Sequence, residues 1–95
     1  MFVIVIRYKV PLTQIDSALA AHRDWLDKGF RDGVFILAGP QNPRTGGVIM
    51  AQNTSREELL VRLGEDPFNK KGLSDFELID MVVRKTDPRL EFLQG

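Results

Sequence analysis

The hydrophobic and polar positions of this chain follow two different periods, and together they predict four strands and two helices. Residues 2–8, "FVIVIRY", are β-branched and aromatic, which favours a strand. "VFILAG" at 34–39 and "VIMAQ" at 48–52 read as two further strands. The segment between them, "PQNPRTGG", is typical of turns, so residues 34–52 are expected to form a hairpin with a long loop. Residues 74–85, "SDFELIDMVVRK", alternate well enough to form the fourth strand.

The predicted helices lie between these strands. The first follows Pro11, which interrupts the first strand, with Thr13 as its expected N-cap and Gly33 as its expected end. The second begins at a capping box, Ser55 followed three residues later by a glutamate, and ends at Gly64. The connector "DPFNKKGL" after it has room for one helical turn, and the tail from about residue 86 is too short to classify.

The resulting order, βαββαβ, predicts a single α+β domain over residues 1–95. Its expected architecture is ferredoxin-like: a four-stranded antiparallel sheet with both helices on one face.

The first strand is apolar on both sides, and this bears on assembly. Phe2, Ile4 and Ile6 alternate with Val3 and Val5, whereas two helices can cover only one face of the sheet. Sheets that are apolar on both faces are normally covered on both. We therefore expect a homodimer in which the uncovered sheet faces pack together.

Composition and charge exclude several classes of function. Thirteen basic and thirteen acidic residues cancel, and no stretch resembles a nucleic-acid-binding pattern, so no nucleic acid is expected. No apolar run is long enough to span a membrane, and no signal peptide is expected, so the cytoplasm is the predicted location. The chain has no cysteine and a single histidine, which argues against thiolate chemistry and common metal sites. We expect neither a metal nor a cofactor.

That single histidine, His22, lies in "SALAAHRDWLDKGF", and a helical wheel places it on the buried face. With about 100° per residue, Ala18, Leu19, Trp25 and Leu26 fall within about 60° of His22. The charged residues of this segment lie about 100° or more away. Such a residue is either a core histidine with satisfied ring nitrogens or a general acid or base in a pocket.

A histidine that moves protons benefits from a neighbouring carboxylate, and two aspartates are candidates. Asp66 precedes Pro67, so it is either the N-cap of a short turn or, if the connector folds back over the first helix, the partner of His22. Asp80 is the alternative, because it lies on the same side of the fourth strand as Phe76 and Leu78, although it could equally face solvent.

An ordered set of motifs resembles the YCII-related (YciI-like) family. It comprises the N-terminal strand, a histidine on the first helix, "GVFILAGP" at 33–40, a hairpin into "GGVIMAQ", and "DPF" at 66–68 before "KKGL". The family is similar to the wider dimeric α/β-barrel superfamily, whose subunits pair their sheets. The resemblance implies an enzyme with a histidine–aspartate pair, carried here by His22 and Asp66.

This sequence departs from some relatives, which have a basic residue one turn before the histidine, where this chain has Leu19. A cation that binds substrate would have to come from elsewhere. Arg44 in the hairpin loop and Arg7 on the first strand are the candidates, although surface arginines are usually only solvated.

Two main functions remain open. The first is a small-molecule lyase or isomerase in which His22 transfers a proton and Asp66 orients the imidazole. Gly39 and Pro40 would let the backbone approach a ligand, or they simply end a strand. The second is a non-enzymatic dimer that binds a small molecule or a protein, with the same pair as a structural hydrogen bond. A monooxygenase is a third option, in which Trp25 would line an aromatic pocket rather than belong to the core.

Overall fold

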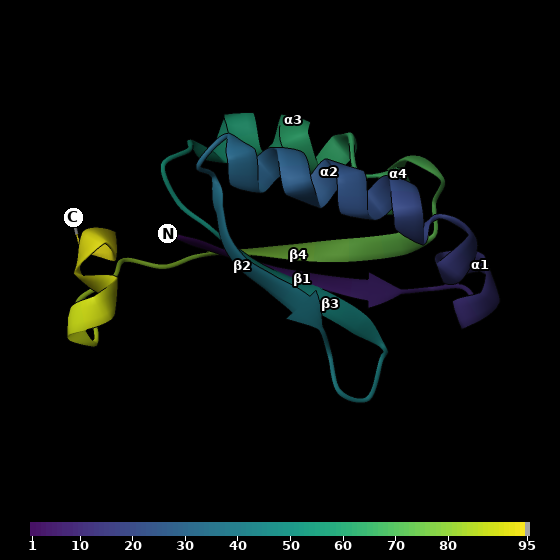
Figure 1. The fold of residues 1–95 in the computed structure, drawn as a ribbon, viewed down its shortest axis with the longest axis horizontal. Coiled ribbons are helices and arrows are strands. Elements are labelled where there is room, and N and C mark those ends of the chain that lie inside the picture. Colours follow the sequence, from purple (N-terminus) through teal and green to yellow (C-terminus); the bar gives the residue numbers. More distant parts are fainter. Residues whose placement is uncertain (95) are drawn as a thin grey trace.

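A computed structural model describes residues 1–94, in which one antiparallel sheet is covered by helices on one face only (Figure 1). The strands are β1 (Phe2–Tyr8), β2 (Phe35–Pro40), β3 (Gly46–Ala51) and β4 (Ser74–Asp80). Their order across the sheet is β2-β3-β1-β4, so the first strand lies in the interior and the hairpin forms one edge. This is the ferredoxin-like α+β fold that the sequence predicted.

Two long helices lie side by side over the sheet, and two short helices lie at the ends of the connections (Figure 1). They are α1 (Leu12–Ser17), α2 (Leu19–Arg31), α3 (Arg56–Gly64) and α4 (Pro67–Lys70). The predicted capping box is present, because the Ser55 side chain accepts a hydrogen bond from the backbone N–H of Glu58 at 3.1 Å.

The first predicted helix is two helices, which corrects the sequence-based expectation. The backbone leaves helical geometry at Ala18 (φ −105°, ψ 2°), and α1 begins directly after Pro11 with no side-chain cap, so Thr13 is not an N-cap. His22 lies in α2, after this break, so its position relative to Trp25 and Leu26 on the helical wheel is unaffected.

The fourth strand is shorter than predicted, and its pairing explains why. Each residue of β4 needs a partner on β1, and the register joins Asp80 to Phe2, the first residue of β1. Beyond Asp80 the backbone of Met81 still exchanges hydrogen bonds with that of Met1, at 2.9 and 3.1 Å, and the pairing with β1 goes no further. β4 therefore ends at Asp80 rather than continuing to residue 85.

The core lies between the sheet and the helices. Phe2, Ile4 and Ile6 point into it from β1, at exposures of 8% or less. Helix α2 approaches the sheet closely at Gly29, because a Cβ atom there would collide with the ring of Phe35. The absence of a side chain on Gly29 is therefore what lets this end of the layer close.

The chain after β4 leaves the body of the domain. It ends in a short 3-10 helix, Pro88–Leu93, which Figure 1 shows standing apart from the sheet and helices. No helix within residues 1–94 has the length and apolar composition needed to cross a membrane.

Candidate active site

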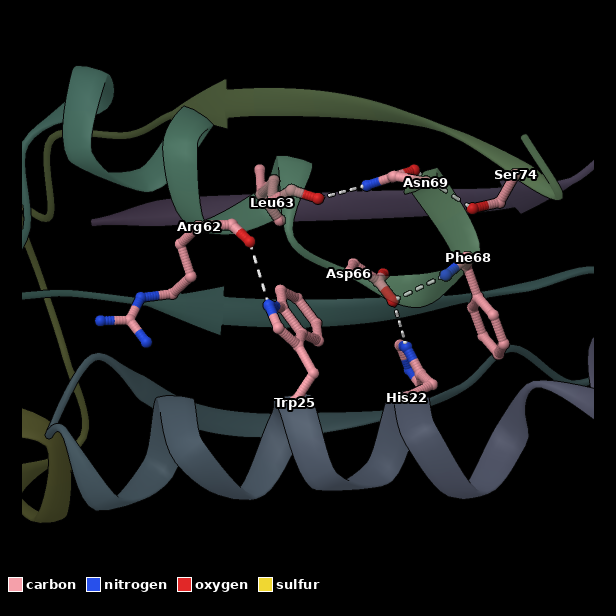
Figure 2. A network of polar contacts seen from close by, with 8 residues as sticks. All are labelled: His22, Trp25, Arg62, Leu63, Asp66, Phe68, Asn69 and Ser74. Atoms are coloured by element: carbon pink, nitrogen blue, oxygen red, sulfur yellow. Dashed lines mark hydrogen bonds and ion pairs between the residues drawn. The ribbon is translucent and has the colours of Figure 1, made fainter. Parts of the chain in front are cut away.

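His22 and Asp66 are in direct contact beneath the helical layer. The Nδ1 atom of His22 lies 2.7 Å from Oδ1 of Asp66, and both residues are buried, at 8% and 0% exposure (Figure 2). An ionised carboxylate only accepts hydrogen bonds, so the proton of this bond belongs to Nδ1. The neutral imidazole then carries its lone pair on Nε2, the form in which a histidine acts as a base.

The two interpretations of Asp66 prove compatible, because one oxygen serves both purposes. Asp66 is the N-cap of α4, and its Oδ1 accepts the backbone N–H of Phe68 at 3.1 Å as well as the His22 proton. Pro67 is the first residue of that helix, a position that suits proline. The local cap therefore fixes the carboxylate that orients His22. The other oxygen, Oδ2, is buried without a hydrogen-bond partner among residues 1–94.

Aromatic rings hold the imidazole plane. The Phe68 ring stacks on His22 with centroids 4.0 Å apart and planes 7° from parallel. The Trp25 ring is a looser neighbour at 5.6 Å and 31°. Stacking and the hydrogen bond to Asp66 together leave His22 little freedom to rotate.

Helix α4 is itself held between its neighbours by a side-chain bridge (Figure 2). The Asn69 side-chain amide donates to the carbonyl of Leu63 at 2.8 Å, and its oxygen accepts the Ser74 hydroxyl at 3.3 Å. These bonds join α3, α4 and β4, so the position of Asp66 depends on three elements that are distant from α2 in the sequence.

A cavity of about 350 Å³ opens beside His22. Its walls are mostly apolar and come from β1, α2, β2, β3 and α4, and His22 is one of its lining residues. Because Asp66 occupies Nδ1, the ring nitrogen available to a molecule in the cavity is Nε2. A cavity of this size is at the small end of those that bind organic ligands.

The structure brings together some of the predicted site residues and separates others. Gly39, Pro40 and Arg44 all line the cavity with His22. Trp25 does not: it packs in the core and donates its indole N–H to the carbonyl of Arg62 at 3.0 Å. This placement corrects the expectation of Trp25 as a wall of the pocket.

Two other candidates lie outside the site. Asp80 is exposed and pairs with Phe2, at the end of β1 away from the cavity residues Ile6 and Tyr8, so it is not the carboxylate partner of His22. Arg7 is also exposed and forms an ion pair with Glu77 on the neighbouring strand, at 3.3 Å.

Among the cavity residues that sequence reasoning missed, Tyr8, Arg23 and Phe68 are those with an aromatic or charged side chain. Arg23 is next to His22 in the sequence, and the helical wheel assigns it to the polar face, yet it is exposed at the cavity and is one of its lining residues. Phe68 follows Asp66 by two residues, and a signal was present, since the cap that fixes Asp66 also fixes the start of α4.

Arg44 is held at the cavity by its neighbours. Its Nη2 donates to Oδ1 of Asp16 on α1 at 2.6 Å, which ties the β2–β3 loop to the first helix. The hydrogen bond with Asp16 raises the pKa of Arg44 above its ordinary value against an opposing effect of desolvation, and Tyr8 adds to the increase. Among residues 1–94, no three histidine or carboxylate side chains lie close enough together to hold a metal.

Comparison with known proteins adds a family and a fold. The family model described as "YCII-related domain" matches residues 1–82, in agreement with the motifs noted above. A solved structure of 5-chloro-2-hydroxyhydroquinone dehydrochlorinase from Burkholderia phenoliruptrix, in complex with 2,5-dihydroxybenzoquinone, is similar in fold, with a TM-score of 0.70 and 22% sequence identity. The match covers 85% of this chain and 93% of that one. No curated protein sequence matches this chain.

Proposed function

This chain belongs to the YCII-related family, and on that premise we propose that it is a small-molecule enzyme, a lyase or an isomerase in which His22 transfers a proton. The observation that carries the proposal is the buried His22–Asp66 bond of 2.7 Å beside an open cavity. A structural hydrogen bond in a non-enzymatic binding module would not require the imidazole to line a cavity. The dehydrochlorinase activity of the structural neighbour, an elimination, is compatible with a lyase on this fold.

The proposed chemistry begins with a carbon acid in the cavity. Nε2 of His22 takes a proton from carbon, and the C–H electron pair becomes part of a new π bond. In a lyase, a leaving group on the adjacent atom departs with its own bonding pair. In an isomerase, no group leaves and His22 returns the proton to another atom. Asp66 stabilises the imidazolium that forms and keeps Nε2 directed at the substrate.

The test uses 5-nitrobenzisoxazole, a neutral probe that reports an accessible base in an apolar cavity. Removal of its ring C–H proton forms a nitrile, and the N–O bond breaks to release a coloured phenolate. We expect the protein to accelerate this elimination and His22→Gln to lower the rate about 10²- to 10⁴-fold, the contribution of a positioned base. A His22→Gln protein as active as the original, or a wild-type protein no faster than free imidazole, would contradict the proposal.

We also propose that the uncovered sheet face joins two copies of the chain. The register aligns Leu37, Met50, Val3 and Ile79 in one row across all four strands, on the face without helices. Leu37 and Ile79 are 47% and 41% exposed in the single chain, which is a poor environment for aliphatic side chains. A second copy presenting the same row would cover them.

Sedimentation equilibrium tests this pairing. The wild-type protein should show the mass of a dimer, and Val3→Lys should shift it to a monomer because a charge then lies in the middle of the row. Val82→Lys is the control, since Val82 follows the sheet and is already 73% exposed. A monomer mass for the wild-type protein at every concentration would refute the pairing.

A further inference from the structure

We propose that the substrate carries a negatively charged oxygen, and that Arg23 and Arg44 bind this oxygen where the cavity meets solvent. The inference rests on the proposed function, because it assigns a substrate class to the same cavity. It does not depend on what His22 does to the bound molecule. The ligand class is a small, mostly apolar acid, with a carboxylate or a ring oxyanion at one end.

The first argument is the charge of the cavity wall. Its ionisable lining residues are Arg23, Arg44, Tyr8 and His22, and no carboxylate is among the side chains that line it. The nearest acid to the reacting centre, Asp66, has no exposed surface and lies on the far side of the imidazole. A ligand in the cavity therefore meets two cations, the Tyr8 hydroxyl and the uncharged His22 ring, which favours an anion over a cation of the same shape.

Arg23 supplies a cation that nothing in the described chain neutralises. It is exposed, and its side chain forms no ion pair or hydrogen bond with any of residues 1–94. It directly follows His22 on α2, so the same helix presents the base and this charge. All of its guanidinium donors remain available to a ligand.

Arg44 can also bind an anion, although it already forms an ion pair within the chain. Its ion pair with Asp16 engages Nη2, and a guanidinium has five N–H donors, so donors remain for a ligand. Asp16 does not line the cavity, and its contact holds the loop that carries Arg44 against α1. Asp16 therefore engages part of the guanidinium and leaves its other donors free for a ligand.

The remaining walls define the rest of the ligand. Leu26, Ile49 and Phe68 make the interior apolar, and about 350 Å³ suits a single ring or a short branched chain. With its anionic oxygen on the arginines and its apolar part in the cavity, the ligand lies against His22. One small molecule therefore contacts both the arginines and the apolar interior of the cavity.

Two ring compounds of nearly equal shape test the inference by isothermal titration calorimetry at low ionic strength. One is 4-hydroxybenzoate, which carries a carboxylate, and the other is its neutral amide, 4-hydroxybenzamide. The acid should bind about 10- to 100-fold more tightly than the amide, the range expected for charge-assisted hydrogen bonds. Failure of the acid to bind, or equal affinity for the two compounds, would overturn the inference.

Substitutions identify the groups responsible. Arg23→Gln and Arg44→Gln should each weaken acid binding about tenfold or more and leave amide binding unchanged. Arg56→Gln is the matched control, because it removes the same charge from an exposed position on α3 that does not line the cavity, and it should leave both affinities unchanged. Equal loss in the control would mean that net charge alone attracts the acid, which overturns the assignment.

Asp16→Asn separates binding by Arg44 from a structural role of its ion pair. This variant and Arg44→Gln break the same contact, but Asp16→Asn keeps the guanidinium and removes the competing carboxylate. It should bind the acid at least as tightly as wild type does. If instead it weakens acid binding as much as Arg44→Gln, Arg44 acts only as a structural tie and the inference is wrong.

His22→Gln keeps this test independent of the proposed reaction. The inference predicts that this variant retains the preference for the acid, although it loses the elimination activity. Retained activity in His22→Gln together with a strong preference for the acid would refute the proton-transfer role alone. Loss of activity with no preference for the acid would refute the anion site alone.

Discussion

Trp25 and His22 lie one turn apart on the same face of α2, and both bond across to the elements opposite (Figure 2). Each is 8% exposed, so burial does not distinguish them. The Trp25 indole donates to a backbone carbonyl and packs against the Phe35 ring at 5.2 Å, so its surroundings are closed. His22 bonds to a carboxylate and its other nitrogen is next to a cavity.

The difference shows how one helix face can serve two purposes. At the Trp25 end, the partners are a neutral carbonyl and hydrocarbon, which stabilise the fold and offer nothing to a ligand. At the His22 end, the hydrogen-bond partner is the Asp66 carboxylate, and a cavity interrupts the apolar packing. This arrangement costs stability but provides an accessible base. Substitutions should therefore divide into those that lower the stability of the fold and those that lower the activity.

The largest expected effect is on stability, at the closed end of α2 where Trp25 packs in the core. Trp25→Ala should lower the free energy of unfolding by about 3–5 kcal/mol, because it leaves a cavity and an unpaired carbonyl at Arg62. Urea denaturation measures the loss. The remaining folded protein should still eliminate 5-nitrobenzisoxazole, since Trp25 does not line the cavity. Val61→Ala, at a position that is 67% exposed, is the control with little expected change. A loss below about 1 kcal/mol would show that this end is not closed.

Asp66→Asn is expected to keep the fold and to lower the activity, the reverse of Trp25→Ala. The amide oxygen can still accept from Phe68 and His22, and the amide nitrogen replaces an oxygen that has no partner. The fold should therefore survive, whereas the elimination rate should fall about 10- to 100-fold with the loss of a charged hydrogen bond.

Asp66→Ala provides the contrast for that experiment. It removes the N-cap as well as the charge, so it should also cost about 0.5–2 kcal/mol of stability. An Asp66→Asn protein with full activity would show that the charge of Asp66 is not needed at the open end.

A smaller effect is expected at the ring that stacks on His22. Phe68→Leu nearly keeps the volume and the α4 cap but removes the aromatic contact at 4.0 Å. We expect the elimination rate to fall about 2- to 10-fold, in proportion to a stacking energy of about 0.5–1.5 kcal/mol. Phe30→Leu, at a position that is 41% exposed and distant from His22, should not change the rate. Equal rates in Phe68→Leu and wild type would mean that Asp66 alone orients the imidazole.

The smallest effect belongs to the rim of the closed end. Arg62 forms an ion pair with Asp32 at 3.0 Å, with its side chain 23% and that of Asp32 40% exposed. Arg62→Gln should cost at most about 1 kcal/mol, and less in high salt, as for other partly exposed pairs. A double-mutant cycle with Asp32→Asn isolates the pair. A coupling well above that value would place this rim among the main supports of the closed end.

The sequence alone predicted much of this difference between the two ends of α2. The 3.6-residue period put His22 and Trp25 on the buried face of a helix, and the two-residue period of β1 gave the sheet its inner and outer sides. The capping box at Ser55 and the Asp-Pro pair marked where α3 and α4 begin. These are local properties, because capping and hydrophobic periodicity depend on residues a few positions apart.

Only the tertiary structure determined three features: the break at Ala18, the end of β4 and the residues that surround His22. The sequence made Asp66 the leading candidate and left Asp80 as the alternative, because spacing alone could not choose between them. The strand register then placed Asp80 at the far end of β4, whereas α4 brought Asp66 to His22. Arg23 reads as a solvated residue on the helical wheel and becomes part of the cavity only through the strands opposite. Local patterns determine which side of an element is buried, but the neighbours found there depend on how distant segments pack, which no short-range period encodes.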